Sequence, residues 1–340
     1  MASIVFGVGA SHSPLLAIKP DQWGLRAQDD RRNPGHFFRG RKLSFDELVS
    51  LRKEEPFNAK LTLDVMQEQD RRNQEHVDLL GRKIREAKLD VLVIFGDDQH
   101  EILLADNNPA FLVFTGEQIP FMPTSKERFE HMTPAIRLAD WARTPGEAMM
   151  LRGASELGRH VVSSVVRDGF DVSVSEKVLP KPGGEDGLGH AFGFFWHRML
   201  GDLKDLPDMA TLPIFINTFF PPNQPTARRV LEFGRAVGHA IRSWKKGARV
   251  GIAASGGFSH FVIDEELDKR LIDAITLRDD ATITSEPETN YQSGTSEIKN
   301  WIAAMGATEG TGLEFKLIDY IPCYRSEAGT GNAMAFALWS

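Results

Sequence analysis

The sequence predicts an α/β fold, with a central and mostly parallel sheet flanked by helices. Runs such as "SIVFGVGA" and "VLVIFG" are continuously apolar, as is typical of strands that are buried on both faces. These runs alternate with segments of helical periodicity, which is the pattern of an α/β domain. Because no linker, internal repeat or low-complexity tract interrupts the pattern, we expect residues 1–340 to form a single catalytic domain.

The N-terminal elements can be assigned from these patterns. "SIVFGVGASH" predicts a first buried strand, and residues 20–56 then form a polar, arginine-rich excursion with weak periodicity. Within the excursion we expect one short helix near residues 44–53, capped by Ser44. A loop/helix excursion of this length is usually a functional lid or an interface arm. Residues 60–88 are helical in pattern and lead into a second buried strand, "LDVLVIFGDD".

The same alternation continues to the C-terminus. We expect helices near residues 153–167, 225–245, 264–278 and 295–306. We expect strands at residues 170–175 and 211–219, and in "ARVGIAASGG", "FKLIDYIPCY" and "NAMAFALW".

Charge and composition narrow the class of protein. The net charge of −7 gives no electrostatic reason to expect nucleic acid or an anionic membrane as a partner. No apolar run approaches the ~18 residues of a membrane span, and the N-terminus lacks the basic region of a signal peptide. Cys323 is the single cysteine, which excludes internal disulfides and a thiolate metal cluster. We therefore expect a cytoplasmic location.

Polar and reactive residues recur where the predicted strands end. His12 follows the first strand, "DDQH" (residues 97–100) follows the second, and His260 follows "IAASGGFS". A histidine in such a position is more often a hydrogen-bonded structural residue than a ligand. Because the carboxyl ends of parallel strands meet at one edge of a sheet, however, three such ends favour one shared active site there.

Two further residues could belong to this site. His190 lies between glycines and a block of aromatic residues in "GLGHAFGFFWH", which suits a proton-transferring imidazole beside a flat substrate. An aromatic core segment with a glycine turn explains the same pattern equally well. Glu297 falls in the first turn of a predicted helix, where a carboxylate commonly serves only the helix dipole or a capping box.

Six segments together carry a family resemblance over nearly the whole chain. They are "GVGASHSPLL", "VLVIFGDDQH", "GLGHAFGFF", "PIFINTFFPPNQPTARRVLEFGRAVGHAI", "SGGFSHFVIDEELDKRLIDAI" and "SGTSEIKNWIAA". In this order they resemble the class III extradiol ring-cleavage dioxygenases, the superfamily of the protocatechuate 4,5-dioxygenase β subunit.

The resemblance implies a non-haem Fe(II) site and O2 as co-substrate. Such iron is held by two histidines and one glutamate, with open positions for a catecholic or gallate-like diol and for O2. His12 matches the first histidine ligand and Glu297 matches the carboxylate ligand. His190 matches the acid–base histidine, and His260 matches a histidine that lies behind the ligands or contacts substrate.

The second histidine ligand has two candidates in this chain. The ungapped register, anchored on Phe95 and on Pro109 to Phe111, aligns Gln99 with that ligand and leaves His100 one residue late. A slip of one residue turns a side chain to the opposite face, and a bulge would restore it. We favour Gln99, whose amide oxygen is a weaker ligand than imidazole.

The resemblance leaves other questions open. Members of the superfamily that lose ligands serve as non-catalytic partner subunits, and the same pocket could serve a metal-dependent enzyme of another reaction class. A homodimer and a separate small α subunit are both compatible with it. Arginines of the excursion could pair with a substrate carboxylate, or could form a solvated surface: Arg31, Arg32, Arg39 and Arg41. Better-known members carry a histidine beside the substrate where Ala154 stands.

Overall fold

The computed structural model describes residues 1–179, 184–201, 203, 206 and 209–340. Within these residues one sheet of nine strands has the order β11–β13–β1–β10–β4–β9–β5–β8, and β12 pairs with β13. The strands are β1 (Ser3–Ala10), β4 (Val91–Gly96), β5 (Phe111–Phe114), β8 (Ser173–Ser175), β9 (Ala210–Ile216), β10 (Arg249–Ser255), β11 (His260–Val262), β12 (Phe315–Tyr324) and β13 (Thr330–Trp339). Two separate hairpins are β2 (His36–Phe38) with β3 (Arg41–Leu43), and β6 (Gln118–Phe121) with β7 (Met149–Arg152).

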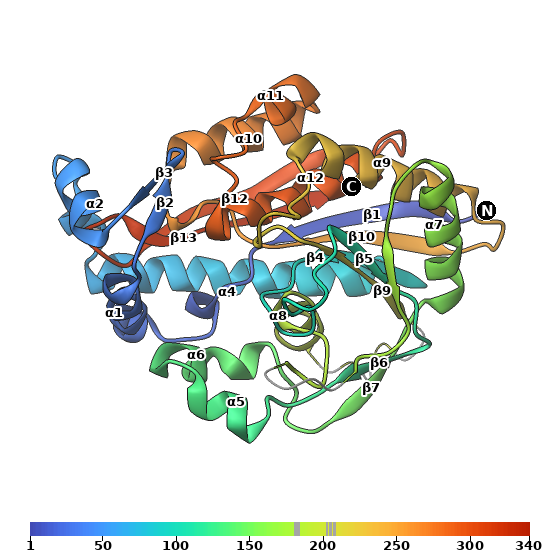
Figure 1. The fold of residues 1–340 in the computed structure, drawn as a ribbon, viewed down its shortest axis with the longest axis horizontal. Helices are drawn as coiled ribbons and strands as arrows, with labels where there is room; N and C mark the ends of the chain where they lie inside the picture. The colour runs from blue at the N-terminus through green and yellow to red at the C-terminus, as the bar shows by residue number, and fades with distance from the viewer. Residues whose placement is uncertain (180–183, 202, 204–205, 207–208) are drawn as a thin grey trace.

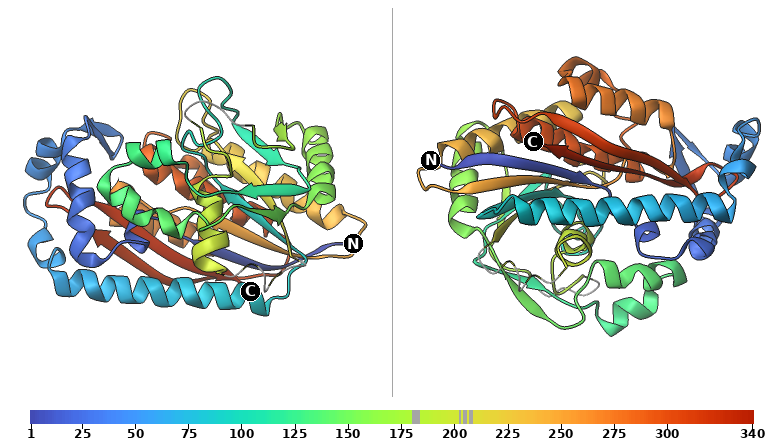
Figure 2. Two further views of the ribbon diagram at one scale, coloured as in Figure 1. Left: turned by 90° about the horizontal axis from the view of Figure 1, so that it is seen from below. Right: turned by 180° about the vertical axis from the view of Figure 1, so that it is seen from behind.

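Helices cover both faces of the large sheet (Figures 1 and 2). The N-terminal helices are α1 (Trp23–Arg32), α2 (Phe45–Leu51), α3 (Phe57–Lys60), α4 (Leu63–Glu86), α5 (Lys126–His131) and α6 (Pro134–Ala139). The later helices are α7 (Ser155–Arg167), α8 (His190–Phe194), α9 (Ala227–Ser243), α10 (Glu265–Leu277), α11 (Asp280–Ser285) and α12 (Ile298–Ala307). In Figure 1, α4 and α8 lie below the sheet, and α9 and α12 lie above it.

The four central strands β1, β10, β4 and β9 run parallel, as the buried apolar runs predicted. The antiparallel strands lie outside them: β13 pairs with β1, and β5 pairs with β9. This confirms the expected α/β class with a mostly parallel centre. Because the four central strands point the same way, the loops that follow them meet at one edge of the sheet.

Side chains of β4 explain why its sequence reads as one unbroken apolar run. Val93 and Phe95 join the core on the side of α9 and α12, whereas Leu92 and Ile94 join the core on the side of α4 and α8. Successive side chains of a strand point to opposite faces, so a strand covered on both sides needs apolar residues at every position. Because both faces of the strand are apolar, the sheet packs between two layers of helices.

The excursion of residues 20–56 contains more regular structure than its sequence predicted. The expected short helix is α2, and Ser44 caps it in a capping box with Glu47. The chain also forms α1 and the β2–β3 hairpin, which weak periodicity did not predict. Helix α1 buries only two apolar side chains, Trp23 and Ala27, and apart from the half-buried Leu25 its other side chains are polar. Periodicity is a poor guide to such a helix, because tertiary contacts rather than an apolar stripe hold it in place.

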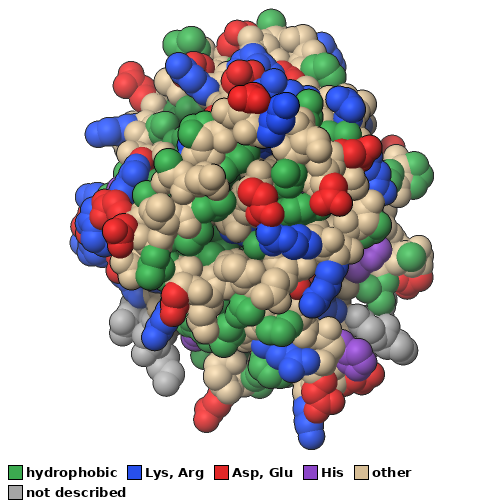
Figure 3. Space-filling model, turned by 90° about the vertical axis from the view of Figure 1, so that its left-hand side faces the viewer, with side chains coloured by type: hydrophobic (Ala, Val, Ile, Leu, Met, Phe, Trp, Pro, Cys, Tyr) green, Lys and Arg blue, Asp and Glu red, His purple; other side chains and the backbone are tan. Residues whose placement is uncertain are grey.

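Residues 101–152, for which the sequence predicted no element, contain β5 to β7 and the two short helices α5 and α6. These helices lie below the sheet in Figure 1, on the same side as α8. None of the helices in the described part of the chain is long and apolar enough to cross a membrane. On the face shown in Figure 3, acidic and basic side chains are interspersed, without a large area of either sign.

Candidate metal centre and its pocket

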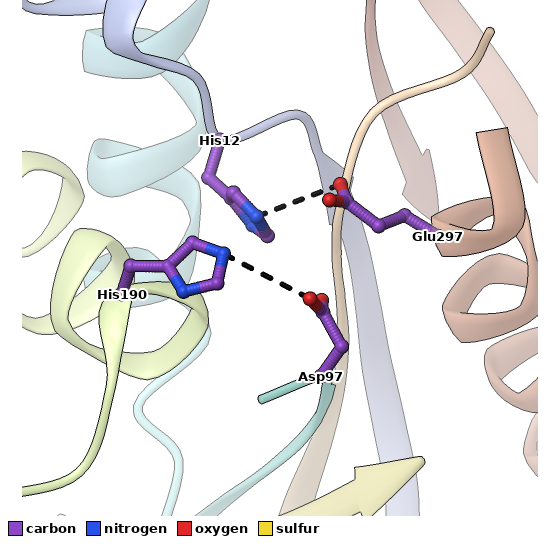
Figure 4. Close-up of side chains that lie close together, drawn as sticks. All are labelled: His12, Asp97, His190 and Glu297. Atoms are coloured by element: carbon purple, nitrogen blue, oxygen red, sulfur yellow. Dashed lines mark ion pairs between the residues drawn. The ribbon is translucent and has the colours of Figure 1, made fainter. Parts of the chain in front are cut away.

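Four side chains from four separate segments converge at the carboxyl edge of the sheet (Figure 4). His12 follows β1, Asp97 follows β4, His190 begins α8, and Glu297 immediately precedes α12. Each offers one possible ligand atom, and these atoms all lie within 4.8 Å of one another. His12, Asp97 and Glu297 are buried, and His190 is half-buried. The chain therefore gathers two imidazoles and two carboxylates in one small volume.

The protonation of His12 follows from its hydrogen bonds. The Ser255 hydroxyl donates to the Ala191 carbonyl at 2.6 Å, so it accepts from His12 Nδ1 at 3.0 Å. His12 Nδ1 then carries the proton, and the lone pair is on Nε2. That atom is buried, has no hydrogen-bond partner, and lies 3.5 Å from Glu297 Oε2. A buried lone pair facing a carboxylate oxygen is the arrangement that a cation would satisfy.

Glu297 is held as a carboxylate by its neighbours. The Gly257 N–H donates to Oε2 at 2.9 Å, and His260 Nε2 lies 3.1 Å from Oε1. Burial by itself raises the pKa of Glu297, but the facing rings of His260 and His12 hold that pKa well below its ordinary value. The sequence placed Glu297 in the first turn of a helix; it instead ends a short 3₁₀ helix, Ser293–Glu297, and is the N-cap residue of α12.

The structure separates the two candidates at the end of β4. The Gln99 amide Nε2 donates to Glu297 Oε1 at 3.3 Å, so this side chain reaches the cluster. The backbone of His100 has a φ of 57°, and its ring stacks on Phe220 with the centroids 3.5 Å apart. His100 does not line the pocket that contains the cluster. The ungapped register aligned Gln99 with the ligand position, and the role of Gln99 as a ligand stays a prediction.

His260 is fixed behind Glu297. Its Nδ1 donates to the Phe258 carbonyl at 2.7 Å, which leaves Nε2 to face the carboxylate. A side chain at Gly294 would place its Cβ 2.0 Å from the His260 ring, so only glycine allows this close approach. Burial lowers the pKa of His260, but Glu297 raises it more, and the net direction is upward. The contacts therefore orient His260 to hold Glu297 in place.

His190 is anchored by Glu101, which sequence patterns did not identify. Its Nδ1 lies 2.8 Å from Glu101 Oε2, and its backbone N–H donates to Oε1 at 2.9 Å. Arg143 donates to the same Oε1 at 3.0 Å. Gly189 makes room for the carboxylate, because a Cβ there would lie 1.7 Å from Oε2. Burial lowers the pKa of His190, but Glu101, Asp97 and the other carboxylate of the cluster raise it to about 10.

Asp97 and Asp98 have different surroundings, although they are adjacent in sequence. Asn300 donates to Asp97 Oδ1 at 3.2 Å, and Asp97 Oδ2 is buried without a hydrogen-bond partner. Burial and the charge of Glu297 raise the pKa of Asp97 to about 6. Asp98 accepts the backbone N–H groups of residues 101, 102 and 103, and so shapes the loop that carries Gln99 and Glu101. In the sequence, the only sign of these two roles was the polar run at residues 97–100 after the second predicted strand.

The cluster opens into a cavity of about 740 Å³, which is within the usual range for a small-molecule site. Gln99 and His260 line it together with three members of the cluster. Phe194 and Phe261 add aromatic wall, and Arg26 lines it from α1. The donor set of imidazole and carboxylate suits iron, zinc or manganese, and the cavity suits a flat ligand.

The structure places four arginines of the excursion, and Ala154, away from this pocket. The sequence left two readings open for four arginines, and the structure favours the surface reading, because none of them lines this cavity: Arg31, Arg32, Arg39 and Arg41. Arg31 pairs instead with Glu327, and Arg39 pairs with Asp264. Ala154 precedes α7 and lines a different cavity, of about 860 Å³. The composition of the excursion did not show which of its side chains would face the cavity.

Comparison with known proteins identifies a family for this chain. Residues 62–328 match the model of a family described as the catalytic LigB subunit of aromatic ring-opening dioxygenase. The matched region contains Gln99, His190, His260 and Glu297, whereas His12 lies before it.

Curated relatives match over part of the chain. A 2,3-dihydroxyphenylpropionate/2,3-dihydroxicinnamic acid 1,2-dioxygenase of Azotobacter vinelandii is 29% identical over 172 residues, which are 50% of this chain and 44% of that protein. A gallate dioxygenase of Pseudomonas putida is 27% identical over 180 residues, 50% of each chain. The matched regions span about half the length of these curated relatives. Because the family model covers most of the described residues, the chain belongs to the LigB family of aromatic ring-opening dioxygenase subunits.

Proposed function

We propose that this chain is a non-haem Fe(II)-dependent extradiol dioxygenase, in which residues 1–340 act as one catalytic domain. Its reaction opens the ring of a catecholic or gallate-like diol beside the two hydroxylated carbons and places both atoms of O2 in the product. The observation that carries the proposal is the unpartnered Nε2 lone pair of His12 facing Glu297 in an aromatic-walled cavity. The names of two relatives, a dihydroxyphenylpropionate dioxygenase and a gallate dioxygenase, support a diol substrate.

The metal ligands in this proposal are His12, Gln99 and Glu297. His12 offers Nε2, since Ser255 occupies its Nδ1. Glu297 offers its carboxylate, and Gln99 would offer its amide oxygen after a half-turn of the amide group. When bound, Fe(II) would supply the Lewis-acidic centre that draws charge from the diol oxygens and activates O2. The remaining cluster carboxylate, Asp97, adds negative charge beside this cation.

His190 is the proposed acid–base residue. Because Glu101 occupies Nδ1, the ring presents Nε2 to the cluster, and Nε2 lies 3.8 Å from Asp97 Oδ2. The charge of a bound cation would offset the carboxylates that raise the pKa of His190, and Nε2 could then accept a proton from a diol hydroxyl and return it when the ring opens. Glu101 stabilises the imidazolium formed in between, by charge and by the hydrogen bond to Nδ1.

His260 lines the cavity and keeps Glu297 oriented. Its Nε2 lies 3.1 Å from Glu297 Oε1, and its Nδ1 is fixed on a backbone carbonyl. A ligand carboxylate that is itself held from behind cannot turn away from its metal. His260 thus acts first as a positioning residue, and it also lines the cavity that would take the substrate.

A second reading is a non-catalytic partner subunit of such a dioxygenase. Gln99 favours it, because an amide oxygen holds Fe(II) less firmly than imidazole does. The intact Glu101–His190 pair argues against it, because a subunit used only for assembly has no need of a buried acid–base dyad. A cytoplasmic location, a homodimer and a separate small α subunit stay predictions from the sequence.

The test is iron binding after anaerobic loading, measured on the wild type and on the Gln99→Ala and His100→Ala variants. We expect close to one iron per wild-type chain, a clear loss in Gln99→Ala, and no loss in His100→Ala, the matched control next along the chain. Loss in His100→Ala alone would mean that a bulge brings that histidine into the site. No iron in the wild type would favour the partner-subunit reading.

A further inference from the structure

One cation in the substrate cavity has unused hydrogen-bonding capacity. Arg26, on α1, lines the same cavity as the metal cluster, and its side chain is only 12% exposed. Nη1 donates to Asp29 Oδ2 at 2.8 Å, whereas Nε is buried and has no hydrogen-bond partner. A guanidinium carries five N–H donors in a fixed plane, and a buried donor without an acceptor is costly. Arg26 therefore has one donor, Nε, without an acceptor, and a bound ligand could supply that acceptor.

The other arginines near this position are already engaged. Arg143 donates to Glu101 and Glu185, and Arg128 pairs with Glu185. Arg325 uses Nε, Nη1 and Nη2 on Asp30 and Asn332. In the described part of the chain, Arg26 is the arginine with a buried N–H group that has no partner.

The local charges also favour an additional anion. Burial and the positive charge of Arg325 lower the pKa of Arg26, and the carboxylates of Asp29 and Asp30 only partly oppose them. Asp29 is shared, because Thr133 donates to the same Oδ2 at 2.9 Å. A further carboxylate beside Arg26 would offset both the desolvation and the repulsion.

Phe261 connects Arg26 to the metal end of the cavity. The Arg26 Cζ lies 5.9 Å from the centroid of the Phe261 ring, and that ring lies 5.3 Å from the ring of His260. His260 in turn contacts Glu297. An aromatic face thus leads from the ligand carboxylate to the unpartnered guanidinium, which suits a flat ring bound between the two.

We propose that Arg26 binds an anionic substituent of the substrate and so makes this site select a carboxylated diol over its neutral ester. The diol faces His12 and Glu297, the ring lies along Phe261, and the carboxylate accepts from the N–H groups of Arg26. The planar fork of arginine matches a carboxylate, which a lysine would contact at a single point. The inference rests on the proposed function, because it assigns the diol end to the metal.

The test is calorimetric binding to the anaerobic, Fe(II)-loaded full chain, with two matched pairs of probes. The pairs are gallate with methyl gallate, and 3-(2,3-dihydroxyphenyl)propionate with its methyl ester, which differ only in the charge at the carboxyl group. The wild type should bind one acid more tightly than its ester. Arg26→Met should weaken that acid by about 10- to 100-fold and change the ester by less than about threefold. Arg26→Lys should fall between them.

Arg31→Met is the matched control, because Arg31 lies on the same helix and pairs with Glu327 away from the cavity. It should leave acid and ester binding unchanged. The inference is overturned if the wild type does not prefer either acid, or if Arg26→Met weakens acid and ester equally. Oxygen uptake separates the two proposals. If acid binding depends on Arg26 but no O2 is consumed, the anion site is retained and the dioxygenase proposal is rejected. If acids and esters are turned over equally, the dioxygenase proposal is retained and the anion site is rejected.

Discussion

Replacing Glu101 with glutamine tests the proton-transfer role of His190. Glu101 accepts from His190 Nδ1 at 2.8 Å, from the His190 backbone N–H at 2.9 Å, and from Arg143 at 3.0 Å. Glutamine has nearly the same shape but a single oxygen and no charge, so its NH2 group must face one of these donors. A hydrogen bond to a charged group contributes about 1.5–3 kcal/mol, which corresponds to a fall in kcat of about 10- to 150-fold.

The assay is O2 uptake at saturating diol, with iron content measured on the same samples. Because the change removes support for the imidazolium and not a substrate contact, kcat should fall while KM and iron content stay close to wild type. Glu185→Gln is the matched control. Glu185 also pairs with Arg143, but within the described part of the chain it makes no hydrogen bond or ion pair with His190. Glu101→Asp should restore part of the rate. An unchanged kcat in Glu101→Gln, or a loss of iron together with the rate, would refute the reasoning.

Three further outcomes are expected. Asp30→Asn should lower the free energy of unfolding by about 3–5 kcal/mol in a denaturant titration, because it leaves Arg325 buried without its charge partner. The pKa of Asp30 is lowered in the folded chain, since Arg325 outweighs burial, so this stabilisation is present above the unfolded pKa of about 3.9 and is lost as the pH falls through the folded value. Ser255→Ala should weaken Fe(II) binding by about 10- to 100-fold in a competition titration, because His12 Nδ1 loses its acceptor. Fe(II) at about 100 times its Kd should stabilise the chain by about 2.7 kcal/mol, and a chelator should reverse this.

Each of these outcomes can fail in a distinct way. Wild-type stability in Asp30→Asn would mean that the buried pair contributes nothing to holding α1. Unchanged iron affinity in Ser255→Ala would mean that the tautomer of His12 is set by some other contact. A melting temperature that does not respond to Fe(II) would mean that the metal does not bind the folded state preferentially.

The fold could be predicted where burial leaves a clear pattern. Strands such as β1 and β4 are apolar at every position because helices cover both faces, and this pattern is visible in one sequence. Helix α1 has no such pattern. Its position depends on the ion pair between Asp30 and Arg325, which are 295 residues apart in sequence. Contacts of this kind are set by the tertiary fold, and no local periodicity reports them.

The candidate site was predicted in part for the same reason. Strand ends identified His12, Gln99 and His260, because parallel strands must bring their carboxyl ends together. Their proposed roles as ligands and catalytic residues remain to be measured. Glu101 escaped prediction because it lies in a loop without periodicity, and its function depends on the glycine that precedes His190.

The arginines of the excursion also show what the sequence could and could not predict. The composition of the excursion indicated that it could supply a carboxylate-binding arginine, and four residues on it were considered. None of the four lines the cavity, whereas Arg26, on the same segment, does. Which arginine turns inward is decided by the packing of α1 through Trp23 and Ala27, and not by charge density along the sequence.

The most direct test of the central claim is the fate of oxygen. The Fe(II)-loaded chain is mixed with a carboxylated diol under ¹⁸O2, and O2 uptake and the mass of the product are followed together. The account predicts consumption of one O2 for each diol, and a ring-opened product that carries both labelled atoms. Iron-bound protein that consumes no O2 with any diol, or that releases hydrogen peroxide and leaves the ring intact, would contradict it.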